Sequence, residues 1–345
     1  MWVKIVILTV LTLESLAFKT TRHYIQSPFG NWREFNSGYH IQSVNENGRV
    51  EVLEKTLTKP QLDTGATLTE KVLKHAKIYS DIEDVIVAIV DPKLGGHGHE
   101  SFNAIPMNPA VQKIWRSKVI EPIYDYLVEN EHQDLFFACM LFYETLNSTR
   151  PSGFGVFVTI GILSNLHLVK GYVPNPRKSS GMEVVPYLYS TGTERAIRIS
   201  GSIYHRLEVK GDRTRSWRVR VEKAEKVVSF SDLNSGTDID EINKIHARKL
   251  SNNESDVPGQ LINKKLGGRG DDPYNVVPMD PTALEALNTR VEAPVRAFFC
   301  NSTNKDRSVV LTVLVVYENN VSTRPAGFIT ISRGLDSDFK MFIPN

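Results

Sequence analysis

Hydrophobic and polar residues alternate over short segments in each half of the chain, as expected for half-buried β-strands. The first two segments flank Asn47-Gly48, and their counterparts flank Lys210-Gly211-Asp212, both of which are typical of hairpin turns. Runs rich in β-branched and aromatic residues follow later in each half. We expect antiparallel strands over these segments, in chain order residues 39–44, 49–53, 135–143 and 154–160, and then 206–209, 217–221, 309–317 and 328–331.

Residues at helical spacing predict two helices in each half. The first helix is expected over residues 69–76 and again over residues 240–247. The second helix begins at a proline suited to a first turn, at Pro109 and at Pro281. A further proline within each second helix predicts a kink or a break, at Pro122 and Pro294. Together with the strands, these helices predict an α+β domain that occurs twice.

The two halves align as copies of one another. Residues 84–109 match residues 256–281 with eleven identities in 26 positions. Composition alone would give about two. Residues 143–154 match residues 317–328 with eight identities in twelve. The chain is therefore predicted to be an internal duplication, with a Pro- and Ser-rich joint at residues 172–181.

The amino terminus has the pattern of a cleaved secretory signal. Lys4 precedes an apolar run over residues 5–13, and small residues follow at Ser15 and Ala17. We therefore expect a signal peptide at residues 1–17, a first domain at 30–171, a linker at 172–181 and a second domain at 182–345. No later segment is long or apolar enough to span a membrane, so we expect a secreted, extracellular protein. Four sequons fit this location as glycosylation sites: Asn147, Asn253, Asn301 and Asn320.

Composition limits the remaining possibilities. The chain has 345 residues, of which 41% are hydrophobic, so it can form two packed cores and is neither disordered nor fibrous. Its 41 Lys and Arg residues against 39 Asp and Glu residues leave a net charge of +2, so any polyanion site must be a local patch. Cys139 and Cys300 are too few for a disulfide scaffold; they could pair with each other or remain thiols.

Several spaced motifs occur together in each copy. The second copy has Asp-Val-Pro-Gly-Gln at 256–260, Leu-Gly-Gly-x-Gly at 266–270, and Asn275 three residues before a Pro-Met pair. A helix and a Ser-Thr-Arg-Pro turn follow. This order resembles the DNA/RNA non-specific endonucleases, and most closely a secreted branch similar to the nuclease domain of type VII secretion effectors. The resemblance implies two tandem ββα-metal (His-Me finger) nuclease-like domains, each an antiparallel sheet with helices.

The resemblance also implies which residues would carry catalysis. In such nucleases a histidine at the end of the first motif is the general base, and an asparagine on the following helix holds Mg²⁺. A glutamate farther along that helix supports the water shell of the metal. The base position is occupied by Ala88 in the first copy and Gln260 in the second, and the metal-ligand position by Gln112 and Leu284.

These replacements predict the loss of catalysis. The amide of Gln260 can orient a water molecule but cannot accept its proton, and Leu284 has no donor atom for a metal. Glu292 keeps the helix glutamate in the second copy. If activity remains, Gln260, Glu292 and Asp256 are the candidate catalytic residues, and Asn275 and Glu292 the candidate metal ligands. No cofactor is expected, apart from Mg²⁺ if residual nuclease activity exists.

Several histidines have two open interpretations. His97 and His99, together with Glu100, could bind zinc or supply a displaced base, or they could lie in a solvated loop. His75 and His246 recur at one position of the first helix, where they could share a catalytic role or brace the packing.

Arginines provide the candidates for phosphate binding. Arg150 and Arg324 occupy the same place in the repeated Ser-Thr-Arg-Pro turn, and each could form a structural ion pair or bind phosphate. Arg269 lies in the glycine-rich loop of the second copy. A further cluster around Trp217 could form a polyanion patch or a solvated hairpin: Arg213, Arg215, Arg218 and Arg220.

The sequence as a whole favours a secreted tandem nuclease-like protein that is catalytically inactive. It would act as a binding module for nucleic acid, another polyanion or a protein. The alternative is an active extracellular metal-dependent endonuclease with a non-standard base in the second domain. The sequence does not indicate an oligomeric state.

Overall fold

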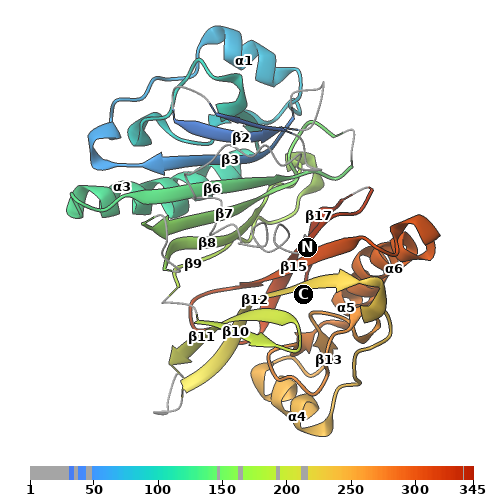
Figure 1. The fold of residues 1–345 in the computed structure, drawn as a ribbon. Helices are drawn as coiled ribbons and strands as arrows, with labels where there is room; N and C mark the ends of the chain where they lie inside the picture. The colour runs from blue at the N-terminus through green and yellow to red at the C-terminus, as the bar shows by residue number, and fades with distance from the viewer. Residues whose placement is uncertain are drawn as a thin grey trace. The chain divides into compact units, whose positions relative to one another are not determined.

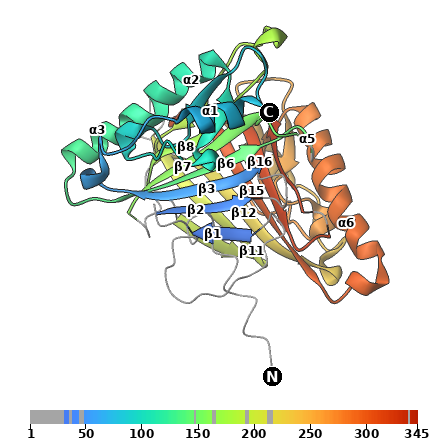
Figure 2. The same ribbon diagram turned by 90° about the horizontal axis from the view of Figure 1, so that it is seen from above.

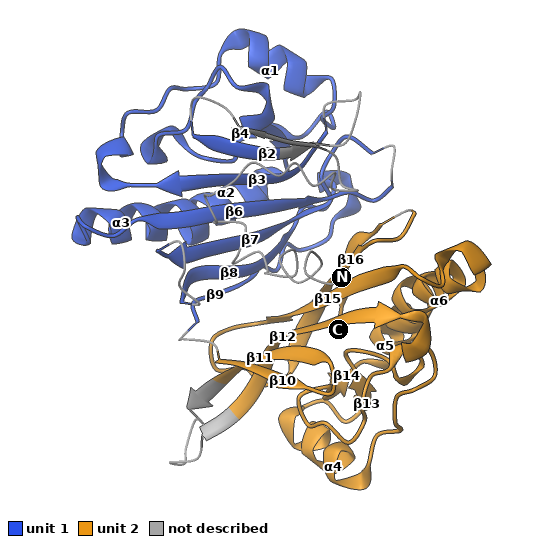
Figure 3. Cartoon of the chain, viewed as in Figure 1, with its two compact units in different colours: residues 1–191 blue, residues 192–345 orange. Residues whose placement is uncertain are grey.

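The computed structural model describes residues 31–345 apart from short gaps at 35–37, 44–48, 146–147, 162–165, 192–194, 211–216 and 337. Within it the chain divides into two compact units, residues 1–191 and 192–345 (Figure 3). The predicted signal peptide at residues 1–17 and the sequon residue Asn147 lie outside the described residues. In the described residues no helix is long and apolar enough to cross a membrane.

Unit 1, residues 1–191, is built on an antiparallel sheet of seven strands (Figure 1). The strands adjoin in the order β1-β2-β3-β6-β7-β8-β9. Their bounds are β1 (Asn31–Glu34), β2 (Tyr39–Ser43), β3 (Val50–Leu57), β6 (Leu135–Phe142), β7 (Gly153–Ile160), β8 (His167–Pro174) and β9 (Tyr187–Tyr189). The predicted antiparallel pairing of the first hairpin and of the later β-rich runs is confirmed.

Between β3 and β6 the chain forms a small ribbon and its helices. Strands β4 (Val85–Ala88) and β5 (Ala104–Met107) pair in antiparallel fashion. Helix α1 (Glu70–Lys77) precedes them, and its first turn is capped by Thr69, whose hydroxyl accepts a hydrogen bond from the backbone N–H of Val72. Helices α2 (Pro109–Trp115) and α3 (Glu121–Glu129) follow. The antiparallel sheet, the two-stranded ribbon and the few helices together confirm the predicted α+β class.

The second helix does not break at its proline, where the sequence predicts a kink or a break. Residues Arg116–Ile120 form a π-helical turn that joins α2 directly to α3. In this turn the N–H of Glu121 bonds to the carbonyl of Arg116, five residues earlier. The wider turn immediately before Pro122 lets the helix continue past a residue that has no N–H to donate. Unit 2 has the same turn at Asn288–Glu292, before Pro294.

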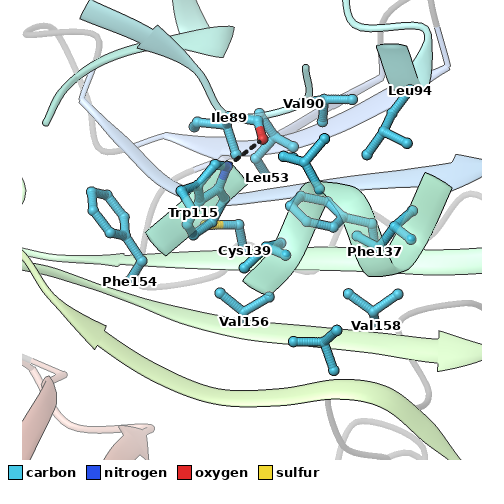
Figure 4. Close-up of a cluster of buried hydrophobic side chains, with 14 of the residues drawn as sticks. Leu53, Ile89, Val90, Leu94, Trp115, Phe137, Cys139, Phe154, Val156 and Val158 are labelled. Carbon is cyan, nitrogen blue, oxygen red and sulfur yellow. Dashed lines mark hydrogen bonds between the residues drawn. The ribbon is translucent and has the colours of Figure 1, made fainter. Parts of the chain in front are cut away.

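One hydrophobic core joins the long helix of unit 1 to its sheet. Trp115 and Ile123 of the helix are buried with Phe137 and Val156 of the sheet (Figure 4). The indole N–H of Trp115 donates to the carbonyl of Ile89 at 3.2 Å, so its polar atom remains satisfied inside the core. Seen from above, α2 and α3 run alongside the sheet (Figure 2).

Unit 2 repeats this arrangement with six strands in its sheet. The order is β10-β11-β12-β15-β16-β17, all antiparallel. The strands are β10 (Arg195–Ile199), β11 (Ser202–Lys210), β12 (Trp217–Ser229), β15 (Ser308–Tyr317), β16 (Pro325–Arg333) and β17 (Lys340–Pro344). The ribbon is β13 (Val257–Gln260) with β14 (Val276–Met279), and the helices are α4 (Glu241–Leu250), α5 (Pro281–Leu287) and α6 (Ala293–Cys300).

The division between the units lies after the expected linker of 172–181. Residues 172–174 belong to β8, which pairs with β7, and the chain then returns to pair β9 with β8. Strand β9 therefore belongs to the first sheet, and unit 1 extends to Thr191. The Pro- and Ser-rich segment 172–181 therefore comprises the end of β8 and part of its connection to β9, two strands of one sheet.

The cysteines are not joined by a disulfide. Cys139 is buried in the core of unit 1, and Cys300 is exposed at the end of α6.

Candidate functional site

The residue at which the resemblance places the general base is Gln260, at the end of β13, where it pairs with Val276 of β14. Both ends of the Gln260 side chain are bonded to backbone. Its amide nitrogen donates to the carbonyl of Thr237 at 3.0 Å, and its carbonyl oxygen accepts from the N–H of Lys264 at 3.0 Å. Gln260 thus ties the strand to the two segments beside it. In unit 1 the corresponding Ala88 is buried and offers no polar group.

The motif asparagines hold the glycine-rich loop. Asn275 is fully buried; its side-chain oxygen accepts from the N–H of Ile262 at 2.8 Å, and its amide donates to the carbonyls of Ile262 and Arg269. Asn103 makes the same set of bonds in unit 1, to Val90 and His97. The candidate metal ligand Asn275 is therefore a structural residue, because its side chain is enclosed and bonded to the loop.

Asp256 and Arg324 are partners. The guanidinium of Arg324 donates two parallel hydrogen bonds to the carboxylate of Asp256, at 2.7 and 2.8 Å. Arg150 makes the same bidentate pair with Asp84 in unit 1, at 2.6 and 2.8 Å. The Asp256 side chain is only 2% exposed. Both arginines thus form the ion pairs of the structural interpretation, and in unit 2 the carboxylate of Asp256 is bonded to the guanidinium of Arg324.

Glu292 is buried on the π-helical turn of unit 2, between two cations. Its carboxylate lies 3.2 Å from the ammonium of Lys265 and 3.2 Å from the guanidinium of Arg296. A carboxylate with two basic partners is already neutralised, and Leu284 on the same helix has no donor atom. Within the described ranges no group of three or more His, Cys, Asp or Glu residues is placed to hold a metal ion. The residues present do not fit the Mg²⁺ site that the resemblance implies.

The remaining basic candidates are mostly paired. Arg269 forms an ion pair with Asp271 across an exposed part of the loop, which lowers the pKa of Asp271 to about 2. Arg220 is buried, and its guanidinium lies 2.6 Å from the carboxylate of Glu222. The polyanion patch around Trp217 therefore lacks Arg220, because this side chain points into the protein. Arg213 and Arg215, and the side chain of Arg218, lie outside the described residues.

Unit 1 has a cluster of titratable groups around Tyr39. The backbone N–H of His97 donates to the Tyr39 hydroxyl at 3.2 Å, and the ammonium of Lys55 lies 4.3 Å from the centre of the Tyr39 ring. Burial raises the pKa of Tyr39 to about 12. Burial also lowers the pKa of Lys55 and, with the Lys55 charge nearby, that of His97. These shifts keep Tyr39 protonated and favour neutral His97 at pH 7.

His99 and Glu100 complete the loop at the edge of this cluster. The imidazole of His99 lies 3.5 Å from the carboxylate of Glu100, and its side chain is 63% exposed. The solvated-loop interpretation therefore fits His99.

One arrangement of side chains that occurs in both units was not predicted from the sequence. In each unit an arginine lies over a tyrosine ring, with 4.3 Å between the guanidinium carbon and the ring centre, as Arg49 over Tyr143 and Arg220 over Tyr317. Each tyrosine hydroxyl donates to a strand carbonyl, of Val50 at 2.6 Å and of Val221 at 2.8 Å. The signal in the sequence is Arg-x-Glu at 49–51 and 220–222, which repeats at the shift of 171.

Three of the four sequon asparagines lie in the described part of the chain. Asn253, Asn301 and Asn320 are all exposed in unit 2.

Comparisons with known proteins return no matching protein-family model and no matching curated protein. Solved structures similar to this chain include an extracellular endonuclease, at 12% identity and a TM-score of 0.28, covering 44% of this chain and 77% of that one. The Sda1 nuclease with bound zinc has 11% identity and a TM-score of 0.27, with 40% and 84% covered. NucA from Streptococcus agalactiae with bound magnesium has 13% identity and a TM-score of 0.27, with 45% and 83% covered. Likeness at this level assigns no activity and no site residue to this chain.

Proposed function

We propose that this chain is a secreted protein of two tandem nuclease-like domains that binds nucleic acid without cleaving it. The motif order that resembles DNA/RNA non-specific endonucleases supports the domain assignment. The ribbon followed by a helix occurs in both units, as β4, β5 and α2 in one and as β13, β14 and α5 in the other, which agrees with it.

The hydrogen bonding of the Gln260 side chain is the main observation in support of an inactive protein. A general base needs a lone pair of suitable basicity directed at the attacking water. Gln260 stands at the base position, and both ends of its amide are bonded to backbone. Ala88 holds this position in unit 1. Phosphodiester hydrolysis therefore lacks a proton acceptor at the expected place in both units.

The metal position supports the same conclusion. Leu284 replaces the ligand, Asn275 is enclosed in the loop, and Glu292 is held by Lys265 and Arg296. Conversely, binding requires only cations and an accessible surface, both of which a domain that has lost its catalytic groups can retain.

The test is to incubate the purified full-length protein with plasmid DNA and with RNA, in Mg²⁺ or Mn²⁺, and to measure binding of the same molecules by gel shift at low salt. We expect both substrates to remain intact and to be retarded. Glu292→Gln removes the candidate catalytic carboxylate. Glu285→Gln, which changes an exposed glutamate on the same long helix, is its control.

Two results would contradict the proposal. Cleavage that is lost in Glu292→Gln and kept in Glu285→Gln would support the alternative, an active endonuclease with a non-standard base. The absence of any shift at low salt would exclude nucleic acid as the ligand.

A further inference from the structure

Each unit contains a cavity beside its first helix, and the two cavities occupy equivalent positions. In unit 1 the cavity is lined by His75 of α1 and by Phe102. In unit 2 it is lined by His246 of α4 and by Tyr274. These residues are related by the shifts of 171 and 172 positions that align the two copies. Gln260 and Glu292 do not line the cavity of unit 2, so it is separate from the positions that resemble a nuclease centre.

The two cavities differ in size. The cavity of unit 1 has a volume of about 70 Å³ and that of unit 2 about 190 Å³. The wall of the cavity includes Tyr79, just after the end of α1, in unit 1 and Leu250, the last residue of α4, at the equivalent position in unit 2. Because a cavity of about 150 Å³ can hold benzene, the cavity of unit 2 can hold one planar ring and that of unit 1 cannot.

The walls in unit 2 suit an uncharged ring. Val221, Val276 and Val277 provide an apolar surface, and Tyr274 adds an aromatic face. The cation of Arg220 is balanced by Glu222 at 2.6 Å. The pocket therefore has little net charge to offer a ligand and a large area for apolar and stacking contacts.

His246 is one of the polar residues that line this pocket. It is half-buried, and its imidazole makes no hydrogen bond or ion pair with any other described residue. A neutral imidazole has one N–H donor and one acceptor nitrogen. It can therefore hydrogen-bond the edge of a ring that carries donors and acceptors of its own, as a nucleobase does.

The helix that carries His246 is basic. Lys249 is exposed and adjoins His246 on the helix surface, and its charge acts on the imidazole; Arg248 projects from the opposite side of the helix and lines another cavity. The helix contains one acidic residue, Glu241, which pairs with Lys244 at 2.6 Å. An exposed cation beside a ring-sized aromatic pocket forms the combination that binds single-stranded nucleic acid, in which phosphates contact cations and bases contact aromatic faces.

Building on the proposed nucleic-acid binding, we infer that the cavity beside α4 holds one unstacked base of a single-stranded nucleic acid. Lys249 contacts an adjoining phosphate, and His246 hydrogen-bonds the edge of the base. A duplex keeps its bases stacked and paired, so it cannot enter the cavity without the cost of extruding a base. Unit 1 does not provide a second base site, because its cavity, which has Tyr79 where unit 2 has Leu250, has a volume of only about 70 Å³.

The test measures the affinity of the full-length protein for a labelled oligothymidylate of about 12 nucleotides. The same measurement is made for a duplex and for an abasic strand of equal length. Leu250→Tyr places in unit 2 the residue that unit 1 carries at this position, and should weaken binding of the single strand by about tenfold, since base stacking on an aromatic side chain contributes this order of affinity. His246→Ala should weaken it by about threefold, the effect of one hydrogen bond. His75→Ala is the matched control and should leave the affinity unchanged.

The expected pattern is tighter binding of the oligothymidylate than of the duplex or the abasic strand, and loss of this preference in the two unit 2 variants. Thermal unfolding verifies that each variant is folded, and His246→Ala, a change at the rim, provides the test if Leu250→Tyr does not fold. Equal binding of the abasic strand, or an unchanged affinity in folded variants, would overturn the base site while leaving nucleic-acid binding intact. If the wild-type protein bound no nucleic acid at all, the proposed function and this inference would both be rejected.

Discussion

At the scale of single residues, the motif positions that persist in both copies stabilise turns and loops. Asp256 pairs with Arg324, Asn275 holds the glycine-rich loop, and Gln260 bridges two backbone segments. In unit 1 the corresponding hydrogen bonds are made by identical residues, Asp84, Arg150 and Asn103. The residue at the position of Gln260 differs between the copies, because unit 1 has Ala88 there. The motif residues shared by both copies are therefore those that stabilise the scaffold.

The Asp256–Arg324 pair gives the first prediction. Arg324→Ala removes both guanidinium hydrogen bonds from the buried Asp256 carboxylate, which keeps the hydroxyl of Ser251 as a donor, and should lower the free energy of unfolding of unit 2 by about 3 kcal/mol. Arg269→Ala, which removes a pair exposed on both sides, should cost less than about 1 kcal/mol. Urea unfolding of both variants checks this. Equal losses would show that the Asp256–Arg324 pair contributes no more than a surface ion pair.

The second residue-scale prediction concerns pH. Burial, with a contribution from the charge of Lys249, lowers the pKa of His246 below the value of about 6.5 that it has in the unfolded chain. Between these two pKa values the unfolded state binds more protons than the folded state, so stability should fall as the pH drops below about 6.5. NMR titration of the imidazole and urea midpoints at several pH values test this, with His246→Gln as the variant that lacks this proton site. A measured pKa of 6.5 or higher would contradict the structure.

At the scale of elements, the glycine-rich loop is defined by close backbone approach. A Cβ atom on Gly268 would lie 1.7 Å from the carbonyl oxygen of Ile262, and one on Gly96 would lie 1.8 Å from that of Val90. No side chain fits in either place, which explains why the second glycine of the motif occurs in both copies.

Gly268→Ala is therefore expected to cost at least about 3 kcal/mol, because the clash is with backbone. Gly201→Ala is the control in the same unit: its φ of +77° is left-handed, unlike that of Gly268, and the added Cβ would meet only the flexible Lys226 side chain, at 3.6 Å. That change should cost about 1 kcal/mol. Unfolding in urea gives both values, and a Gly268→Ala variant as stable as Gly201→Ala would refute the close approach.

Elements were easier to predict from the sequence than their ends and partners. Alternation located the strands of both hairpins, and the recurrence of Arg150 and Arg324 indicated ion pairs. The partners of these arginines could not be read from the sequence, because Asp256 lies 68 positions before Arg324 and only the fold brings them together. The Pro- and Ser-rich composition of residues 172–181 suggested a linker between the domains. The segment instead leads to strand β9, which pairs with β8 in the first sheet. The cavities could not be predicted at all, since their walls come from separate segments.

At the scale of the whole molecule, the balance of charge limits how nucleic acid can be bound. The net charge is +2, and several basic side chains are neutralised by partners, including Arg269 and Arg220. Long-range attraction is therefore weak, and affinity must arise from local contacts such as those of α4.

A shallow salt dependence follows. If Lys249 and few other cations provide the phosphate contacts, the logarithm of the affinity for the single strand should fall with the logarithm of salt concentration with a slope of about −2 or shallower. Titrations between about 50 and 200 mM salt measure it. A slope steeper than about −5 would indicate a larger basic surface elsewhere on the protein.

The π-helical turns also allow events in the history of the chain to be ordered. Both units have this five-residue turn immediately before the equivalent proline, at Arg116–Ile120 and Asn288–Glu292. If the two copies arose by the duplication that the sequence predicts, a feature shared by both was present in the single-domain ancestor, and the turn predates the duplication. Tyr79 and Leu250 differ, so at least one of them was substituted afterwards. The helix geometry is thus the older character, and the difference in cavity size between the two units is the younger one.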